Sequence, residues 1–510
     1  MNRNAFSKDT GVSRREPERY RSYSGARLNV KNISVTCAVL IAVVIMELVS
    51  SSNKSTLIYA LAVVSLVPLF YGIRYALRYP SWFIFALIVA ETVPYFSIIP
   101  IDPGSRWFIR YPLLFPLAIP AVWAAFKTRT LFQGRFALML MFFGWGAVTL
   151  VYSLNPTVSA GRLIPDFLLF ATICFAASRI ENADDVQVVL GRFVLGCGLL
   201  QIITAFAYLF LPEVLGGSGE TLRATWMLDE RGLYRFCGIF NEPNAVGSLM
   251  LATVGSGVAH WHAVTSRWRK LLLALSMIAA VIFAALADSR SETLAAVVGC
   301  IGYGIWKYRW KGAMAVAIVM VLAIGCFTMF SSAIEPYLNR GVDSMTGRTE
   351  AWSFEVSKAE DSPLLGYGYQ SEGEILRDHR FRDWEEIWNR GASTPLHNGY
   401  MTLIIGTGIP ATIFWLVVFI APWWALFRSG EDPWNLMPLA LLVIIPALLL
   451  SIDESGLSEP RYVRGLLLFM CWAMAERYQL VHRAQAAAAE AQPWSRWQEL
   501  FARSTVNGKS

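Results

Sequence analysis

Arg235, Arg348 and His397 have side chains and a setting that suit group-transfer chemistry. The two arginines fall in polar segments that flank apolar runs, and His397 comes just before another apolar run. A guanidinium can pair with phosphate oxygens through two parallel hydrogen bonds, which neutralises the charge that a phosphate leaving group gains. Histidine titrates near working pH and can take the proton of an attacking hydroxyl. Together they would suit transfer of a group from a phosphate to a hydroxyl.

Plainer explanations exist for each residue. Arg348 can be a solvated loop charge or a salt-bridge partner of Glu350. Arg235 can be an interfacial side chain that snorkels to the membrane surface, and His397 can be an ordinary interfacial histidine. The residue types alone leave both interpretations open.

Further candidates lie at the heads of apolar runs, where they could bind a substrate: Glu242, Asn244, Arg290 and Asn398. A charged side chain at membrane depth is costly, which makes Glu242 and Arg290 functional candidates. The structural alternative for Arg290 is pairing with Asp288 or Glu292, and for Asn244 it is capping of a helix.

The composition shows what must position these residues. Of 510 residues, 55% are hydrophobic and only 16% are charged, and apolar runs of about 17 to 25 residues recur along the chain. We therefore predict an all-α polytopic membrane protein with about 12–14 transmembrane helices. The predicted spans are 33–49, 57–73, 81–99, 109–126, 136–152, 163–178, 189–210, 238–262, 270–287, 291–306, 312–332, 399–427, 436–452 and 463–476.

Lysines and arginines between the spans predict the orientation, because cytoplasmic loops are enriched in them. Alternate loops carry Arg74 and Arg78; Lys127, Arg129 and Arg135; Arg267, Arg269 and Lys270; and Lys307, Arg309 and Lys311. With these loops in the cytoplasm, both termini are cytoplasmic and segments 211–237 and 333–398 lie outside. The net charge of +7 is thus a topology signal and does not indicate nucleic-acid binding.

The predicted organisation follows directly. Residues 1–32 form a disordered basic cytoplasmic tail, 33–332 hold helices 1–11, 333–398 form an external loop subdomain, 399–478 hold helices 12–14, and 479–510 form a cytoplasmic tail. The C-terminal tail is expected to be disordered, with an interfacial helix as the alternative for its Trp-bearing part. The cysteines form no CxxC pair and the histidines show no metal-ligand spacing, so neither a metal nor a cofactor is expected.

Short motifs follow one another along the second half of the chain. They are RFCGIFNEPN at 235–244, ADSRS at 287–291, GRTEAW at 347–352, SPLLGYG at 362–368 and HNGY at 397–400, followed by Gly406, Gly408 and Pro410. In this order they resemble the O-antigen ligase and polymerase family over a core of about residues 235–415. Pro410 precedes Ala411 where the family has a second glycine or small residue, which is a mild departure.

The resemblance implies a membrane glycosyltransferase without a metal. Family members move a glycan from undecaprenyl diphosphate to an acceptor hydroxyl at the periplasmic face of the bacterial inner membrane. The acceptor is a lipid A core sugar for a ligase and a growing chain for a polymerase of O-antigen or exopolysaccharide repeat units. The sequence does not separate these two activities.

A transporter of polysaccharide lipids is the alternative from another class, since about fourteen spans is a common transporter number. The chain shows no pair of similar halves, however, and transport does not need an external loop of about 65 residues.

Overall fold

The computed structural model describes residues 79, 81–92, 107–210, 226–228, 234–240, 243–287, 289–315, 317–318, 352–353, 355–371, 374–375, 398–430, 432–452 and 462–507. The predicted N-terminal tail, the first two predicted spans and most of the span predicted at 312–332 lie outside these residues. So do the candidates Glu242, Arg348 and His397.

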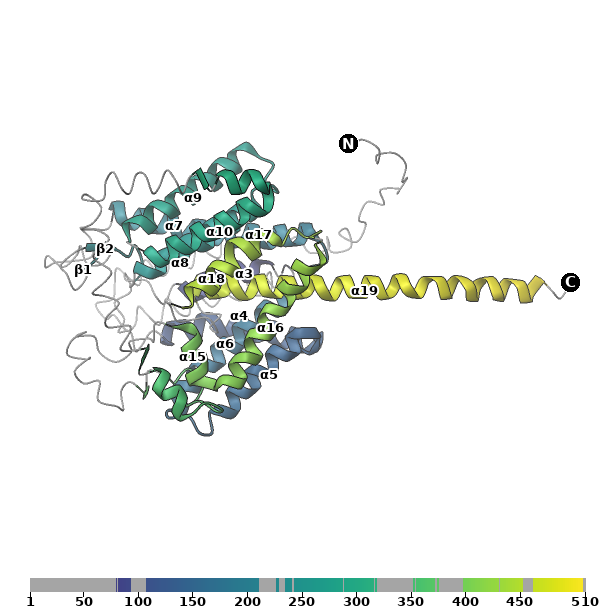
Figure 1. Ribbon diagram of the computed structural model, residues 1–510, viewed down its shortest axis with the longest axis horizontal. Coiled ribbons are helices and arrows are strands. Elements are labelled where there is room, and N and C mark those ends of the chain that lie inside the picture. The colour runs from purple at the N-terminus through teal and green to yellow at the C-terminus, as the bar shows by residue number, and fades with distance from the viewer. Residues whose placement is uncertain are drawn as a thin grey trace, which may run out of the picture. The chain divides into compact units, whose positions relative to one another are not determined.

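Helices make up almost all of the described chain (Figure 1). They are α3 Ser81–Thr92, α4 Trp107–Lys127, α5 Gly134–Thr149, α6 Pro156–Ala177, α7 Ala183–Phe210, α8 Pro243–His260, α9 Arg267–Leu286, α10 Arg290–Tyr308, α15 Gly399–Thr407, α16 Ile409–Ser429, α17 Met437–Leu439, α18 Ile445–Leu450 and α19 Tyr462–Asn507. A short antiparallel hairpin pairs β1 (Trp226–Leu228) with β2 (Tyr234–Phe236). The prediction of an all-α polytopic membrane protein is confirmed, with this hairpin as an addition.

Long apolar runs explain the helices, because a backbone inside a bilayer must satisfy its own hydrogen bonds. Within the described residues, α6, the segment 183–205 of α7, α9 and α16 are long and apolar enough to cross a membrane. Asn155 starts α6 by accepting a hydrogen bond from the backbone N–H of Val158 at 3.2 Å, just before Pro156.

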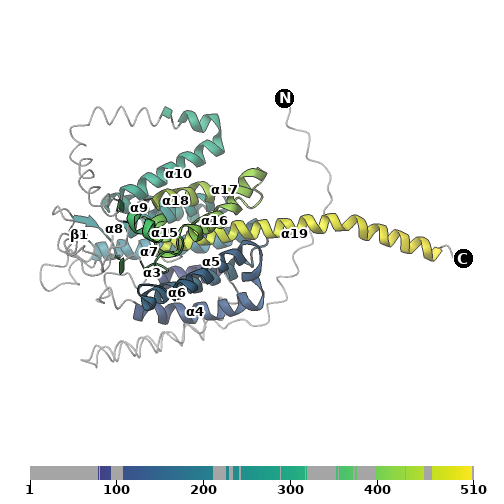
Figure 2. The ribbon, with the colours of Figure 1, turned by 60° about the horizontal axis from the view of Figure 1, so that its bottom comes forward.

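Aromatic side chains belong to the buried core of the bundle. Helix α19 runs between the other helices in both ribbon views (Figure 1 and Figure 2). Trp415 stacks on Phe419 with ring centroids 4.8 Å apart, and Phe419 is in turn nearly parallel to Trp472 at 6.3 Å. Phe136 meets Trp472 edge-on at 5.6 Å. Helices α5, α16 and α19 are therefore held together by ring contacts, which add to the stabilisation from burial.

The chain differs from expectation near its C-terminus. The span predicted at 463–476 and the disordered tail predicted after it form one continuous helix, α19, which runs to Asn507. Residues 463–480 are largely buried in the bundle, whereas residues 482–490 are exposed (Figure 1). The prediction of disorder is wrong here because the alanine run has a high helix propensity and continues a helix that is already nucleated.

Two other predicted spans are interrupted. The span at 399–427 breaks at Gly408 into α15 and α16. The span at 436–452 changes to a π-helix at Ala440–Ile444 between α17 and α18. Pro446 contributes to the second change, because it has no N–H to donate to the carbonyl of Leu442.

Basic loops gather at one end of the bundle, which we call the basic end. Arg135 at the start of α5 pairs with Glu476 of α19, and the neighbouring Arg477 donates to the carbonyl of Ile180 after α6. Trp434, before α17, packs on Tyr478 with centroids 5.4 Å apart. These contacts place the loops after α6 and α16 and the one before α5 at a common end, in agreement with the alternation that the charge pattern predicts.

The Arg135–Glu476 ion pair at this end is largely buried. Glu476 is fully buried, and its carboxylate accepts from the backbone N–H of Arg135 at 2.9 Å and from the guanidinium at 2.7 Å. We predict that Glu476→Ala lowers the free energy of unfolding by about 3 kcal/mol, because it leaves a largely buried guanidinium without its carboxylate. Chemical denaturation of the purified protein in detergent measures this value.

Lys358→Gln is the control, since the ion pair of Lys358 with Asp361 lies at the surface and should contribute little. An unchanged denaturation midpoint in Glu476→Ala would contradict the importance of the buried pair.

Candidate functional site

The heads of α8 and α10 lie in contact at the end of the bundle opposite the basic end. A Cβ placed on Gly247 of α8 would come within 2.6 Å of the Cβ of Ser289 and 2.9 Å of the carboxyl carbon of Glu292. Asn244 lies one turn before Gly247, and Arg290 is the first residue of α10. The sequence motifs at 235–244 and 287–291 are therefore neighbours in space.

Asn398 brings a third motif to this end. The backbone N–H of Gly399 donates to the carbonyl of Ser451, which follows α18, at 2.8 Å. Leu450 of α18 packs with Ala295 in the first half of α10. The first turns of α8, α10 and α15 thus share one end of the bundle, which we call the motif end.

The side chain of Asn398 caps the N-terminus of α15 at this end. Its Oδ1 accepts hydrogen bonds from the backbone N–H groups of Tyr400 at 3.0 Å and Met401 at 3.1 Å, which makes it the N-cap of α15. The sequence predicted a substrate-binding role, and the cap leaves only part of its polar surface for that role.

Arg235 lies on β2, paired in register with Met227 of β1. The next residue, Phe236, is fully buried and packs on Phe283 near the end of α9, with ring centroids 5.3 Å apart. The hairpin is therefore fixed beside the turn that leads from α9 into α10 (Figure 1). The backbone of Arg235 belongs to the motif end, and its side chain lies outside the described part of the structure.

The loop motif at 362–368 fits into the break between α15 and α16. The N–H groups of Tyr367 and Gly368 donate to the carbonyls of Ile405 at 2.7 Å and Gly406 at 3.2 Å. The N–H of Ile409 donates to the carbonyl of Pro363 at 2.8 Å. A break in a membrane helix frees backbone groups that need partners, and the loop supplies them.

Glycines make this close approach possible. Gly366 and Gly408 have φ angles of +68° and +84°, which side chains rarely allow. A Cβ on Gly366 would come within 2.5 Å of the carbonyl oxygen of Ile405, and one on Gly408 would collide with the carbonyl of Leu364. The glycines of the two family motifs therefore fit one another, and Pro410, the departure from the family pattern, lies in the first turn of α16.

A buried polar cluster ties the same loop to α5 and α6. The carboxylate of Asp166, fully buried in α6, accepts from the Tyr369 hydroxyl at 3.1 Å and from the Gln370 amide at 2.9 Å. Arg162, one turn earlier on α6, donates to the carbonyl of Gln370. The N–H of Tyr369 donates to the hydroxyl of Thr149 at 2.9 Å. The loop is thus held on both sides, by the α15–α16 break and by α6.

The sequence analysis missed this cluster. A usable signal was present, because Arg162 and Asp166 are four residues apart beside Pro165 at the head of an apolar run. Residues at this spacing share one helix face. Their partners at 369–370 are about 200 positions away in the chain, so no local pattern connects them.

The described site contains no cluster of acidic, histidine or cysteine side chains that could hold a metal ion. Its polarity comes instead from backbone amides, the carboxylate of Asp166 and the exposed Arg290. Partial burial raises the pKa of the Tyr367 phenol above its ordinary value.

Part of the motif end, including the starts of α10 and α15, belongs to a segment that matches a known protein family. Residues 275–416 match the O-antigen ligase family. The match confirms the resemblance inferred from the motifs, and it contains Arg290, Arg348, His397 and Asn398. It begins after Arg235, Glu242 and Asn244, whose roles stay predictions together with those of the other candidates.

The chain is also similar to a curated relative, the exopolysaccharide production protein ExoQ of Rhizobium meliloti (strain 1021). The two are 22% identical over 360 residues, which covers 66% of this chain and 77% of ExoQ. The similarity therefore covers much more of the chain than the family match does.

The glycine contacts give a first prediction for the site. Gly408→Ala should destabilise the docked loop by about 1–3 kcal/mol from the backbone conformation alone, and the new Cβ also collides with Leu364. Limited proteolysis should then cleave the segment around 355–371 faster than in the wild type. Gly144→Ala in α5 is the matched control, because its Cβ would meet no atom within 4 Å. Equal cleavage of Gly408→Ala and the wild type would refute the docking.

The polar cluster gives a second prediction. Asp166→Ala removes the acceptor of two buried donors and should cost about 2–4 kcal/mol of stability. Tyr369→Phe removes one hydrogen bond and keeps the packing of the ring on Phe142, so it should cost about 1 kcal/mol. Thermal unfolding in detergent measures both. If the two variants unfold at the same temperature, Asp166 is not the shared acceptor.

Proposed function

We propose that this protein is a membrane glycosyltransferase of cell-surface polysaccharide biosynthesis. It moves a glycan from undecaprenyl diphosphate to an acceptor hydroxyl at the periplasmic face of the bacterial inner membrane. The observations that carry the proposal are the match of residues 275–416 to the O-antigen ligase family and the motif end, where Ser289 and Glu292 contact Gly247 of α8 and Asn398 starts α15.

The electrostatics of this end favour a diphosphate. Helices α8, α10 and α15 all begin there, and the first turn of a helix carries a partial positive charge that favours a nearby anion. Arg290 adds a full positive charge at the head of α10. A lipid diphosphate lying at the membrane surface would meet these groups and the arginines of the adjoining segments.

In the proposed reaction, the bond between the sugar and the diphosphate breaks as the acceptor oxygen attacks the sugar. Arg235 and Arg348 stabilise the negative charge that develops on the leaving diphosphate. His397, the residue before the N-cap Asn398, takes the proton of the attacking hydroxyl. Glu242, Asn244, Arg290 and Asn398 bind and orient the lipid-linked sugar.

Two acceptors fit this chemistry. A lipid A core sugar would make the protein an O-antigen ligase, and the end of a growing chain would make it a repeat-unit polymerase. The similarity to ExoQ, whose name refers to exopolysaccharide production, favours the polymerase as the second candidate.

Deletion of the gene tests the function and separates the candidates. Polymer that accumulates on the lipid carrier, with loss of long chains on the lipid A core, indicates a ligase. Short lipid-linked units, with loss of polymer or a core bearing a single repeat, indicate a polymerase. If lipid-linked units accumulate only in the cytoplasmic leaflet, the protein is a transporter and the proposal is wrong.

Complementation of the deletion tests the catalytic residues. We expect Arg348→Ala and His397→Ala to reduce transfer at least about 100-fold, the lower range for loss of a general base or of a charge-stabilising group, at an unchanged protein level. His379→Ala is the control, because His379 lies in a charge-dense stretch where a solvated histidine is expected. Full activity in both Arg348→Ala and His397→Ala would refute the assignment.

Two substitutions of Asn398 separate its role as the N-cap of α15 from its proposed role in substrate binding. Asn398→Ser keeps a side-chain oxygen that caps α15, whereas Asn398→Ala loses it. If Asn398 binds substrate, Asn398→Ser should raise KM while its thermal stability stays close to that of the wild type. Normal kinetics in Asn398→Ser would leave the cap as the only role.

A further inference from the structure

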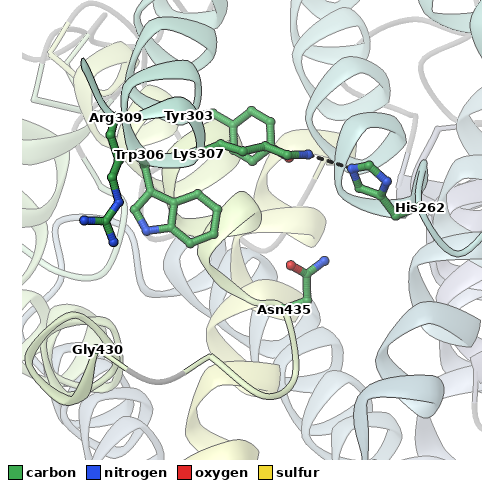
Figure 3. A pocket seen from close by; sticks show the side chains of 7 residues that line it. All are labelled: His262, Tyr303, Trp306, Lys307, Arg309, Gly430 and Asn435. Atoms are coloured by element: carbon green, nitrogen blue, oxygen red, sulfur yellow. Dashed lines mark hydrogen bonds between the residues drawn. The ribbon is translucent and has the colours of Figure 1, made fainter. Parts of the chain in front are cut away.

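A pocket of about 620 Å³ lies at the basic end, away from the motif end (Figure 3). Its lining comes from the ends of α8 and α10, from the end of α16 and from the turn before α17: His262, Tyr303, Trp306, Lys307, Arg309, Gly430 and Asn435. Helices α8, α10 and α16 begin at or near the motif end and finish here, so this pocket is separate from the proposed glycosyl-transfer site.

The lining is rich in hydrogen-bond donors. The ammonium of Lys307 lies 2.6 Å from Nε2 of His262 and donates to the Tyr303 hydroxyl at 2.9 Å (Figure 3). An ammonium only donates, so Nε2 of His262 takes the acceptor role in this contact. Arg309 and the amide of Asn435 add further donors to the same pocket.

No described carboxylate lines the pocket. Asp432, in the same turn as Asn435, uses its oxygens to accept from the backbone N–H groups of Leu436 at 2.6 Å and Met437 at 2.7 Å. Lys307 and Arg309 therefore give the pocket a net positive charge, and an anion would balance it.

Three residues that line the pocket have a left-handed backbone conformation, which is common at binding sites. Arg309, Gly430 and Asn435 all have positive φ angles, of 51°, 66° and 55°. For a residue such as Arg309 this conformation is uncommon, and such positions are found more often at ligand-binding sites than elsewhere. Exposed indole rings of Trp306 and Trp310 lie at the end of α10 beside the pocket, as expected at the surface of a membrane.

We infer that this pocket binds a phosphate group at the membrane surface. An anionic phospholipid headgroup and a free phosphate share this chemistry, with oxygens that would accept from Lys307 and Asn435. Arg309, on the other side of Trp306 in Figure 3, adds positive charge to the same pocket. The indoles beside the pocket would hold the glycerol and upper acyl region of a lipid. The inference does not depend on the proposed glycosyl transfer.

The test uses the full-length protein, purified in a neutral detergent and titrated with phosphatidylglycerol, phosphatidylcholine or inorganic phosphate. Phosphatidylglycerol should bind more tightly than phosphatidylcholine if a lipid headgroup is the ligand, and inorganic phosphate alone should bind if the ligand is soluble. The double variant Lys307→Gln/Arg309→Gln should weaken binding about 30-fold, since each cation near a membrane surface contributes about fivefold.

Arg267→Gln/Arg269→Gln is the matched control, because it removes two exposed cations from the same end without touching the pocket lining. Its binding should stay within about threefold of the wild type. Should the double variant fail to fold, Arg309→Gln alone changes an exposed side chain and should weaken binding about fivefold. Equal losses in the pocket and control variants, or no binding of either phosphate ligand, would overturn the inference.

Discussion

The free backbone groups at the break between α15 and α16 are the constraint on which the motif end depends. A buried N–H or carbonyl without a partner costs free energy comparable to a lost hydrogen bond, so a helix breaks in a buried place only where other protein groups replace its hydrogen bonds. Residues 363–368 provide the replacement through the main chain, and Gly366 and Gly408 let the two backbones approach. Loop and helix break therefore stabilise one another, and neither would be stable alone.

This mutual support turns an external loop into part of the bundle. Asp166, fully buried in α6, holds Tyr369 and Gln370, and Asn398 caps α15 after the loop returns. The family motifs that flank these anchors are thereby connected at short range to a rigid scaffold. A site that must align a lipid-linked donor with an acceptor gains from such rigidity, because small errors in position reduce the rate strongly.

The sequence predicted most of the helices and the family, because long apolar runs and ordered motifs are local signals. It also predicted that the loops before α5, after α6 and after α16 lie on one side, and the contacts of Glu476, Arg477 and Trp434 place these three loops at a common end. It missed the break at Gly408, since a glycine and Pro410 in an apolar run also fit an uninterrupted span. It missed Asp166 for a different reason, because the partners of this carboxylate, Tyr369 and Gln370, come from a distant part of the chain.

Hydrogen–deuterium exchange of the full-length protein in detergent tests the docking of the loop most directly. If the N–H groups of Tyr367 and Gly368 donate into the helix break, peptides covering 363–371 should exchange about as slowly as peptides from α15. Exchange of 363–371 as rapid as in the exposed part of α19 near residues 482–490 would contradict the account, because the break would then lack the partners that it requires.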